Sequence, residues 1–191
     1  MPGGMVLWLD ANDIQGDGTP TADGAAVTTW TDKSGAGHHA TNGGDPTTIV
    51  FTDGTIGNMA AVRLDGNDWI KTLLDIDAGV RPDVTIFAVY DYRQVDGDDS
   101  LWGQENGGWD RFTLLNHGVG PGITNGDGMY TVSEMGQAGI GFVINEIQMD
   151  EGVANGSHVL IDGAAPANGG IFTGNNSAGG PANAFAIGAE R

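Results

Sequence analysis

Residues 84–90 read Val-Thr-Ile-Phe-Ala-Val-Tyr and form the most continuous apolar run of the chain. Such a run is typical of a strand that is buried on both faces or lies centrally in a sheet. Elsewhere, apolar runs often alternate with polar residues and are broken by Gly, Asn or Asp, while helical periodicity is nearly absent. We therefore predict strands at residues 6–10, 60–64, 68–71, 84–92, 100–104, 111–116, 128–133, 140–149, 157–162 and 184–188.

Many short strands separated by turns favour an all-β antiparallel sandwich over a parallel α/β sheet. The 191 residues suit one domain, residues 1–191, and no linker or internal repeat divides them. Gly-rich segments at 117–128 and 163–183 are expected to be long irregular loops, which are usually functional or mobile. Residues 1–4 are expected to be an artificial start.

The chain is strongly acidic: 25 Asp and Glu residues face seven Lys and Arg, giving a formal charge of −18 and a pI near 4.1. This charge excludes nucleic acid and anionic membranes as partners, because phosphate binding needs Lys and Arg. Either the charge keeps an exported or salt-adapted protein soluble, or Ca²⁺ occupies several loops. Cysteine is absent, and no signal peptide or transmembrane segment is seen. Aspartate directly precedes glycine at Asp17, Asp23, Asp53, Asp65, Asp96, Asp127 and Asp162.

Three blocks carry a family resemblance: Leu-Trp-Leu-Asp-Ala-Asn-Asp at 7–13, Trp-Thr-Asp-Lys-Ser-Gly-Ala-Gly-His-His-Ala-Thr at 30–41, and Ala-Val-Arg-Leu-Asp-Gly-Asn-Asp-Trp-Ile at 61–70. In this order they resemble the laminin-G-like, concanavalin-A-like jelly-roll modules of large bacterial surface proteins. The resemblance implies a jelly roll, and residues 157–163 continue it loosely. Such modules usually extend past a segment like 185–188 into another strand, so a C-terminal strand is expected to be missing.

Within that superfamily the acidic, cysteine-free chain looks most like the peptide-binding modules of calcium-rich repeats-in-toxin adhesins. This resemblance implies an extracellular, cell-surface location and a role in cell adhesion and biofilms. It also implies a monomeric module of a larger multidomain protein, with a Ca²⁺-dependent pocket that grips the C-terminus of a peptide on another cell. A calcium-dependent lectin that binds a glycan with the same loops is the alternative.

The segment 96–111 concentrates acids, two tryptophans and an arginine. Because Ca²⁺ takes six to eight oxygen ligands, we predict a metal cage from this segment and the turn 125–128. Its proposed ligands are Asp98, Asp99, Asn106, Asp110, Asn125 and Asp127. The proposed ligand-binding residues are Trp102, Gln104, Trp109, Asp110 and Arg111, with a tryptophan face for a side chain or sugar and an arginine fork for a carboxylate. The alternative is that 96–99 and 125–128 are plain hairpin turns and the tryptophans belong to the core.

A second candidate metal loop spans residues 10–18. Asp10 and Asp13 resemble the start of an EF-hand loop, but the loop follows a predicted strand and lacks the glutamate twelve residues on. A calcium site and an Asx-turn scaffold both remain open. His38 and His39 point to opposite faces of a strand, which disfavours a transition metal. Residues 65–68 are expected to form a hairpin turn between strands.

One strand invites comparison with a catalytic motif. Laminarinase-type glycosidases of this architecture carry a strand with the order Glu, apolar residue, Asp, apolar residue and, after a bulge, a second Glu. In this chain Glu146 and Glu151 match the two Glu positions, and Gln148 replaces the central Asp. Retaining hydrolysis needs two nearby carboxyls with separated pKa values. We therefore predict that the chain is not an enzyme. A degenerate glycosidase remains an alternative.

Overall fold

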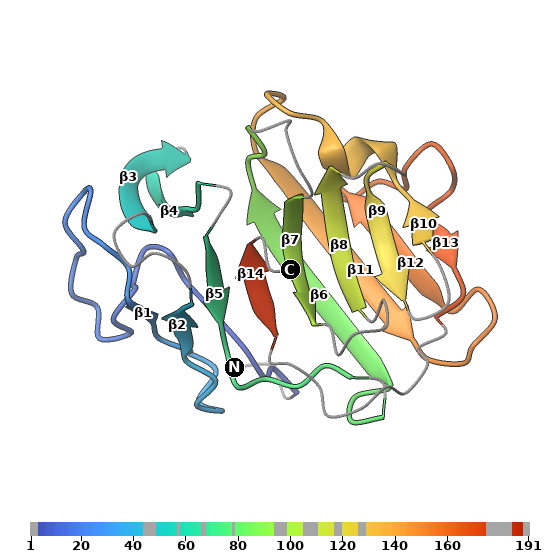
Figure 1. Ribbon diagram of the computed structural model, residues 1–191, viewed down its shortest axis with the longest axis horizontal. Coiled ribbons are helices and arrows are strands. Elements are labelled where there is room, and N and C mark those ends of the chain that lie inside the picture. Colours follow the sequence, from blue (N-terminus) through green and yellow to red (C-terminus); the bar gives the residue numbers. More distant parts are fainter. Residues whose placement is uncertain are drawn as a thin grey trace. The chain divides into compact units, whose positions relative to one another are not determined.

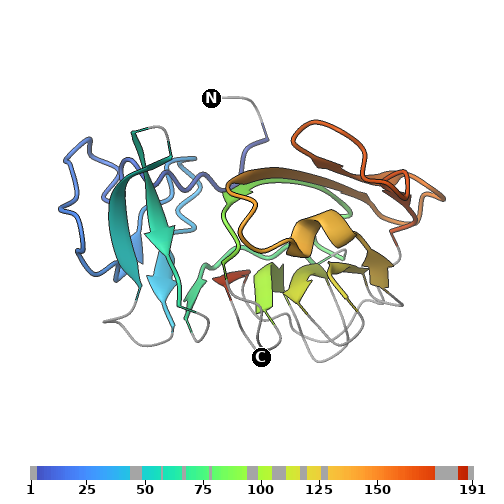
Figure 2. The same cartoon turned by 90° about the horizontal axis from the view of Figure 1, so that it is seen from above.

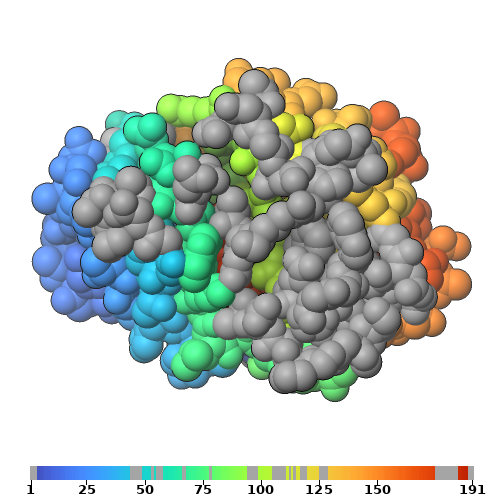
Figure 3. All heavy atoms as spheres, viewed as in Figure 1, coloured from blue at the N-terminus to red at the C-terminus, as the bar shows by residue number. Residues whose placement is uncertain are grey.

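The structure is a computed structural model, and the coloured atoms in Figure 3 are the residues that it describes. These are residues 4–43, 49–56, 58–65, 68–77, 79–93, 99–104, 111–116, 120–125, 129–174 and 185–188. Their regular structure consists of strands and one 3₁₀ turn. None of the described residues forms a helix long and apolar enough to cross a membrane. The chain divides into two compact units, one of Met1–Leu74 with Ala184–Arg191 and one of Asp75–Asn183.

The first unit contains an antiparallel sheet and a separate hairpin. The sheet has the order β1 (Thr29–Trp30), β2 (Ala40–Asn42), β5 (Trp69–Lys71) and β14 (Ala186–Gly188). The hairpin pairs β3 (Val50–Ile56) with β4 (Met59–Arg63). Apolar side chains from the strands and the intervening segments form one core, with Ile14, Val27, Ala40, Ile49, Phe51, Ala60 and Ile70 buried.

The second unit is a sandwich of two antiparallel sheets, which face each other in Figure 2. One sheet has the order β7 (Asp99–Gln104), β8 (Arg111–Asn116), β9 (Gly122–Asn125) and β10 (Met129–Thr131). The other has the order β13 (Ile171–Phe172), β12 (Ser157–Ile161), β11 (Val143–Asp150) and β6 (Asp83–Tyr90). The 3₁₀ turn η1 (Ser133–Gly136) follows β10 (Figure 1).

Alternation along the strands explains the core of this sandwich. On β11 the inward residues Val143, Asn145, Ile147 and Met149 are buried, while the outward residues that alternate with them are partly or fully exposed. Period-two alternation is what a strand with one buried face requires. The prediction of an all-β antiparallel sandwich is confirmed. The jelly-roll connection and the single domain stay predictions.

Most predicted strands lie where the sequence pattern placed them, and β8 matches its predicted range in full. The predicted strand at 6–10 is wrong. Instead of joining a sheet ladder, the Trp8 amide donates to Asp32 Oδ1 and the Trp8 carbonyl accepts from the Lys33 amide. Strands β9 and β13 lie inside the segments 117–128 and 163–183 that were expected to be irregular.

Two further expectations are corrected. Residues 84–90 do form a strand, but among the described strands β6 lies at the edge of its sheet rather than at its centre, and Phe87 and Val89 are exposed. Residues 65–68 do not connect the two strands of a hairpin, because β4 pairs with β3 while β5 pairs with β2 and β14.

Candidate functional site

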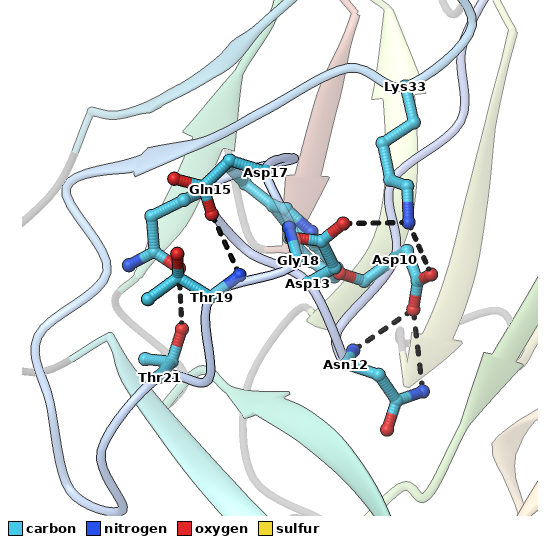
Figure 4. Close-up of polar contacts among 10 residues, drawn as sticks. Asp10, Asn12, Asp13, Gln15, Asp17, Gly18, Thr19, Thr21 and Lys33 are labelled. Atoms are coloured by element: carbon cyan, nitrogen blue, oxygen red, sulfur yellow. Dashed lines mark hydrogen bonds and ion pairs between the residues drawn. The ribbon is translucent and has the colours of Figure 1, made fainter.

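The first candidate site is the loop that begins at Asp10, and its cation is a lysine of the same chain (Figure 4). Lys33 Nζ lies 2.9 Å from Asp10 Oδ2 and 3.0 Å from Asp13 Oδ2. The remaining oxygens serve the backbone: Asp10 Oδ1 accepts the Asn12 amide and Asp13 Oδ1 accepts the Gly18 amide, each at 3.0 Å. All four carboxylate oxygens therefore have donors within the chain.

The charges in this loop stabilise one another. Burial alone would raise the pKa of Asp10, but hydrogen bonds from Lys33 and the Asn12 amide hold it below its ordinary value. The hydrogen bond from Lys33 also lowers the pKa of Asp13, and the two carboxylates raise the pKa of Lys33. The hydrogen bonds of this loop fit the Asx-turn scaffold, with the Lys33 ammonium group in contact with both carboxylates. The calcium role of Asp10 and Asp13 stays a prediction.

Asp32 organises the neighbouring turn and was not singled out from the sequence. It is 5% exposed. Its Oδ1 accepts the amides of Trp8 and Ser34, and its Oδ2 accepts the Ser34 hydroxyl and the His38 amide. The His39 Nδ1 atom accepts the Asp32 amide. The signal was the Asp-x-Ser spacing of an Asx turn, inside a block that had been used only for family resemblance.

The second candidate site lies at one end of the β7–β8–β9 sheet. The cross-strand register pairs Gln104 with Arg111 and Arg111 with Asn125. Asp99 pairs with Asn116 at the opposite end of β7. Five strand residues rise about 17 Å, so Asp99 does not share a metal cage with ligands at the Gln104 end. Its Oδ2 instead accepts the Tyr92 hydroxyl at 2.7 Å.

Gln104 and Arg111 hold the segment 75–82 against this end of the sheet. Gln104 Oε1 accepts the Ile76 amide and Nε2 donates to Asp75 Oδ1, both at 2.6 Å. Arg111 Nη1 donates to the carbonyl oxygens of Ile76 and Arg81, and Nη2 donates to that of Pro82. Both side chains are almost completely buried, at 2% and 1% exposed. Among the described residues, their hydrogen bonds go to the backbone of the segment 75–82 and to the carboxylates of Asp75 and Glu151.

Arg111 is surrounded by acidic side chains. Burial lowers the pKa of Arg111, and the carboxylate of Glu151, with Oε2 at 3.4 Å from Nη2, opposes that shift. Asp77 and Asp83 oppose it more weakly. Asp77 Oδ1 accepts the Gly79 amide at 2.7 Å, whereas Asp77 Oδ2 is buried with no hydrogen-bond partner among the described residues. This end of the sheet therefore holds a carboxylate oxygen that a cation would stabilise.

Of the other predicted site residues, the structure describes Trp102 and Asn125 but not the rest. Trp102 is 2% exposed, so it belongs to the core, as the alternative reading held, and offers no exposed ring face. Asn125 ends β9. No group of three or more His, Cys, Asp or Glu residues suited to a metal occurs in the described part of the chain. Asp98, Asn106, Trp109, Asp110 and Asp127 lie outside the described residues.

The strand that resembles a glycosidase motif does not bring its two glutamates together. Glu146 is on the outer face of β11, where its Oε1 lies 3.7 Å from His158 Nε2. Glu151 contacts the buried Arg111 instead. The two carboxylates therefore have different partners, His158 for Glu146 and Arg111 for Glu151.

The comparisons with known proteins bring no further identification. No family model, curated protein or solved structure matches the chain.

Proposed function

We propose that this chain is the calcium-dependent ligand-binding module of a bacterial surface adhesin, and that it binds the C-terminus of a peptide on a target cell. Its binding site lies at the end of the sheet that contains Gln104, Arg111 and Asn125. Calcium there supplies positive charge and open coordination positions for a ligand carboxylate. The module acts outside the cell and without catalysis.

The observation that carries the proposal is the cross-strand register of β7, β8 and β9. It sets Gln104, Arg111 and Asn125 side by side. Asn106, Asp110 and Asp127 are each one or two residues along the chain from one of these three. This proximity along the sequence is the reason for proposing Asn106, Asp110 and Asp127 as the oxygen ligands.

The donor set at this end fits a hard cation. Carboxylate and amide oxygens are the ligands that calcium prefers, and the buried Asp77 Oδ2 lacks a hydrogen-bond partner among the described residues. Asp99 leaves the proposed cage, because it lies at the far end of β7, whereas Asp98 lies outside the described residues.

The roles of two predicted ligand-binding residues change with the structure. Gln104 and Arg111 become positioning residues that fix the segment 75–82 and the ends of β7 and β8. Trp109 stays the proposed ring face, since Trp102 is buried. Asp110 stays the proposed bridge between the metal and the ligand.

Calorimetric titration with Ca²⁺ tests the metal site. Asp110→Ala and Asp127→Ala should each weaken calcium binding, while Asp17→Ala is the matched control, because Asp17 Oδ1 accepts only the nearby Thr19 amide at an exposed turn. Equal calcium binding by all three variants and the parent would refute the placement of the site.

An array of C-terminal peptides and glycans, probed with Ca²⁺ and with EDTA, tests the ligand class. The proposal expects calcium-dependent capture of peptides with a free carboxyl end and none of amidated peptides. Capture of glycans alone would replace the peptide proposal with the lectin alternative.

A further inference from the structure

Strand β6 has the composition of a central strand and the position of an edge strand. All eight residues of Asp83–Tyr90 pair with β11 in continuous register, without a bulge. On its other side β6 has no strand partner among the described residues. Proteins usually protect such an edge with Lys, Pro, a bulge or a covering segment, and β6 contains none of the first three.

The side chains of β6 are incompletely covered on both faces. On the outer face, Phe87 is 68% exposed and Val89 is 57% exposed. On the inner face, Val84, Ile86 and Ala88 are only half-buried, while the inward residues of the neighbouring β11 are buried. Among the described residues, the inner face of β6 is therefore less completely covered than that of β11, and one more strand would cover it.

We propose that β6 is a strand-addition site that binds an extended segment of a partner protein through main-chain hydrogen bonds. In this mode the free amides and carbonyls of an edge strand provide affinity, and alternate side chains of the guest provide specificity. Apolar side chains on one face of the added strand cover the inward β6 residues Val84, Ile86 and Ala88. The opposite side of the guest lies beside Phe87 and Val89.

The charge around the edge indicates a neutral or basic guest. Asp83 opens β6 and stands directly opposite Asp150 on β11. Burial, followed by the negative charge of Asp83, raises the pKa of Asp150. A lysine or arginine of the guest near this end would relieve the repulsion between the two carboxylates.

A second copy of the chain is the less suitable occupant. Each copy carries a formal charge of −18, so two copies repel each other over the whole surface. A stable dimer also buries about 800 Å² per partner. Among the described residues of β6, only two large apolar side chains are exposed, those of Phe87 and Val89. A single added strand needs no such area, since its backbone supplies most of the contacts.

The test uses the full chain and the synthetic peptide Lys-Val-Thr-Val-Thr-Val-Thr-Lys, in EDTA so that calcium-dependent binding does not contribute. Amide hydrogen exchange should slow across residues 83–90 when the peptide binds. A peptide with proline at its two central positions lacks the required donors and should give no slowing.

Protein variants locate the contact. Phe87→Lys with Val89→Lys adds the charges that natural edges use for protection and should weaken peptide binding about tenfold or more. Ile171→Lys is the matched control, because Ile171 is 57% exposed on β13 at the other edge of the same sheet. It should bind like the parent.

Three results would overturn the proposal: unchanged exchange in residues 83–90, equal binding by the double variant and the parent, or equal weakening by Ile171→Lys. A concentration-dependent dimer that protects residues 83–90 without peptide would show that a second copy is the occupant instead. Because binding is measured without calcium, failure here leaves the calcium-dependent site untouched, and the reverse also holds.

Discussion

Replacing Arg111 with methionine should destabilise the second unit strongly. The guanidinium donates to the carbonyl oxygens of Ile76, Arg81 and Pro82, and it lies against Glu151. Methionine keeps much of the apolar stem but donates to none of these oxygens. The substitution therefore leaves buried acceptors and one carboxylate without their cation.

The structure sets the expected magnitude. A buried acceptor that loses its donor costs about 1–3 kcal/mol, and removal of one partner from a buried ion pair costs about 3–5 kcal/mol in total. Water will reach part of the segment 75–82, so the individual costs do not add in full. We expect Arg111→Met to lower the free energy of unfolding by about 3–5 kcal/mol.

Urea unfolding followed by tryptophan fluorescence measures this change, and hydrogen exchange across 75–82 localises it. Arg93→Met is the control, because the Arg93 side chain is 73% exposed and contacts Asp91; its loss should stay below about 1 kcal/mol. A loss below about 1 kcal/mol for Arg111→Met, with unchanged exchange in 75–82, would refute the positioning role and restore Arg111 as a candidate ligand group.

Three further changes test other parts of the structure. Asn145→Leu should raise the free energy of unfolding in urea by about 1–3 kcal/mol, because neither amide atom of this fully buried residue has a partner among the described residues; a clear loss would mean that the amide is bonded. Lys33→Met should lower the urea midpoint at pH 7. The folded pKa values of Asp10 and Asp13 are below 3.8, and that of Lys33 is above 10.5. The difference in urea midpoint between Lys33→Met and the parent should therefore shrink when the pH falls through the folded pKa values of the aspartates or rises through that of the lysine. A difference independent of pH would contradict the ion pairs. Gly136→Ala should cost about 1–3 kcal/mol, since its Cβ would lie 2.7 Å from Pro121 Cβ and against the Leu115 carbonyl; parent-like thermal unfolding would show that η1 can shift.

The sequence predicted most strands near their observed places, including the three-residue β5, β10 and β14, but it missed the seven-residue β3 as well as the short β1, β2, β9 and β13. Residues 111–116 alternate and are bounded on both sides by turn residues, and β8 matches them. The two-residue β13 and the four-residue β9 lie within Gly-rich sequence. Hydrophobic periodicity does not indicate a strand over so few residues. The 84–90 run shows a different limit, because apolar composition reports burial potential but not position within a sheet.

The geometry around the predicted site residues could not be derived from the sequence. The sequence grouped Asp99 with Asp110 because they are close along the chain, and the register then placed Asp99 at the far end of β7. It assigned Arg111 to a ligand because a lone arginine among acids suggests a fork for a carboxylate. Backbone carbonyls of the segment 75–82, which carry no sequence signal, occupy that fork instead.

Turn formation accounts for part of the surplus of aspartate without any metal ion. Many described aspartates accept a backbone amide within or beside a turn, which requires a short carboxylate but no metal. Overall charge is therefore weak support for calcium, and the support that remains is local to the end of the sheet where Gln104, Arg111 and Asn125 meet. It follows that removing calcium should loosen this end while the turn aspartates keep their backbone bonds. Those aspartates are Asp10, Asp13, Asp17, Asp75, Asp77 and Asp162.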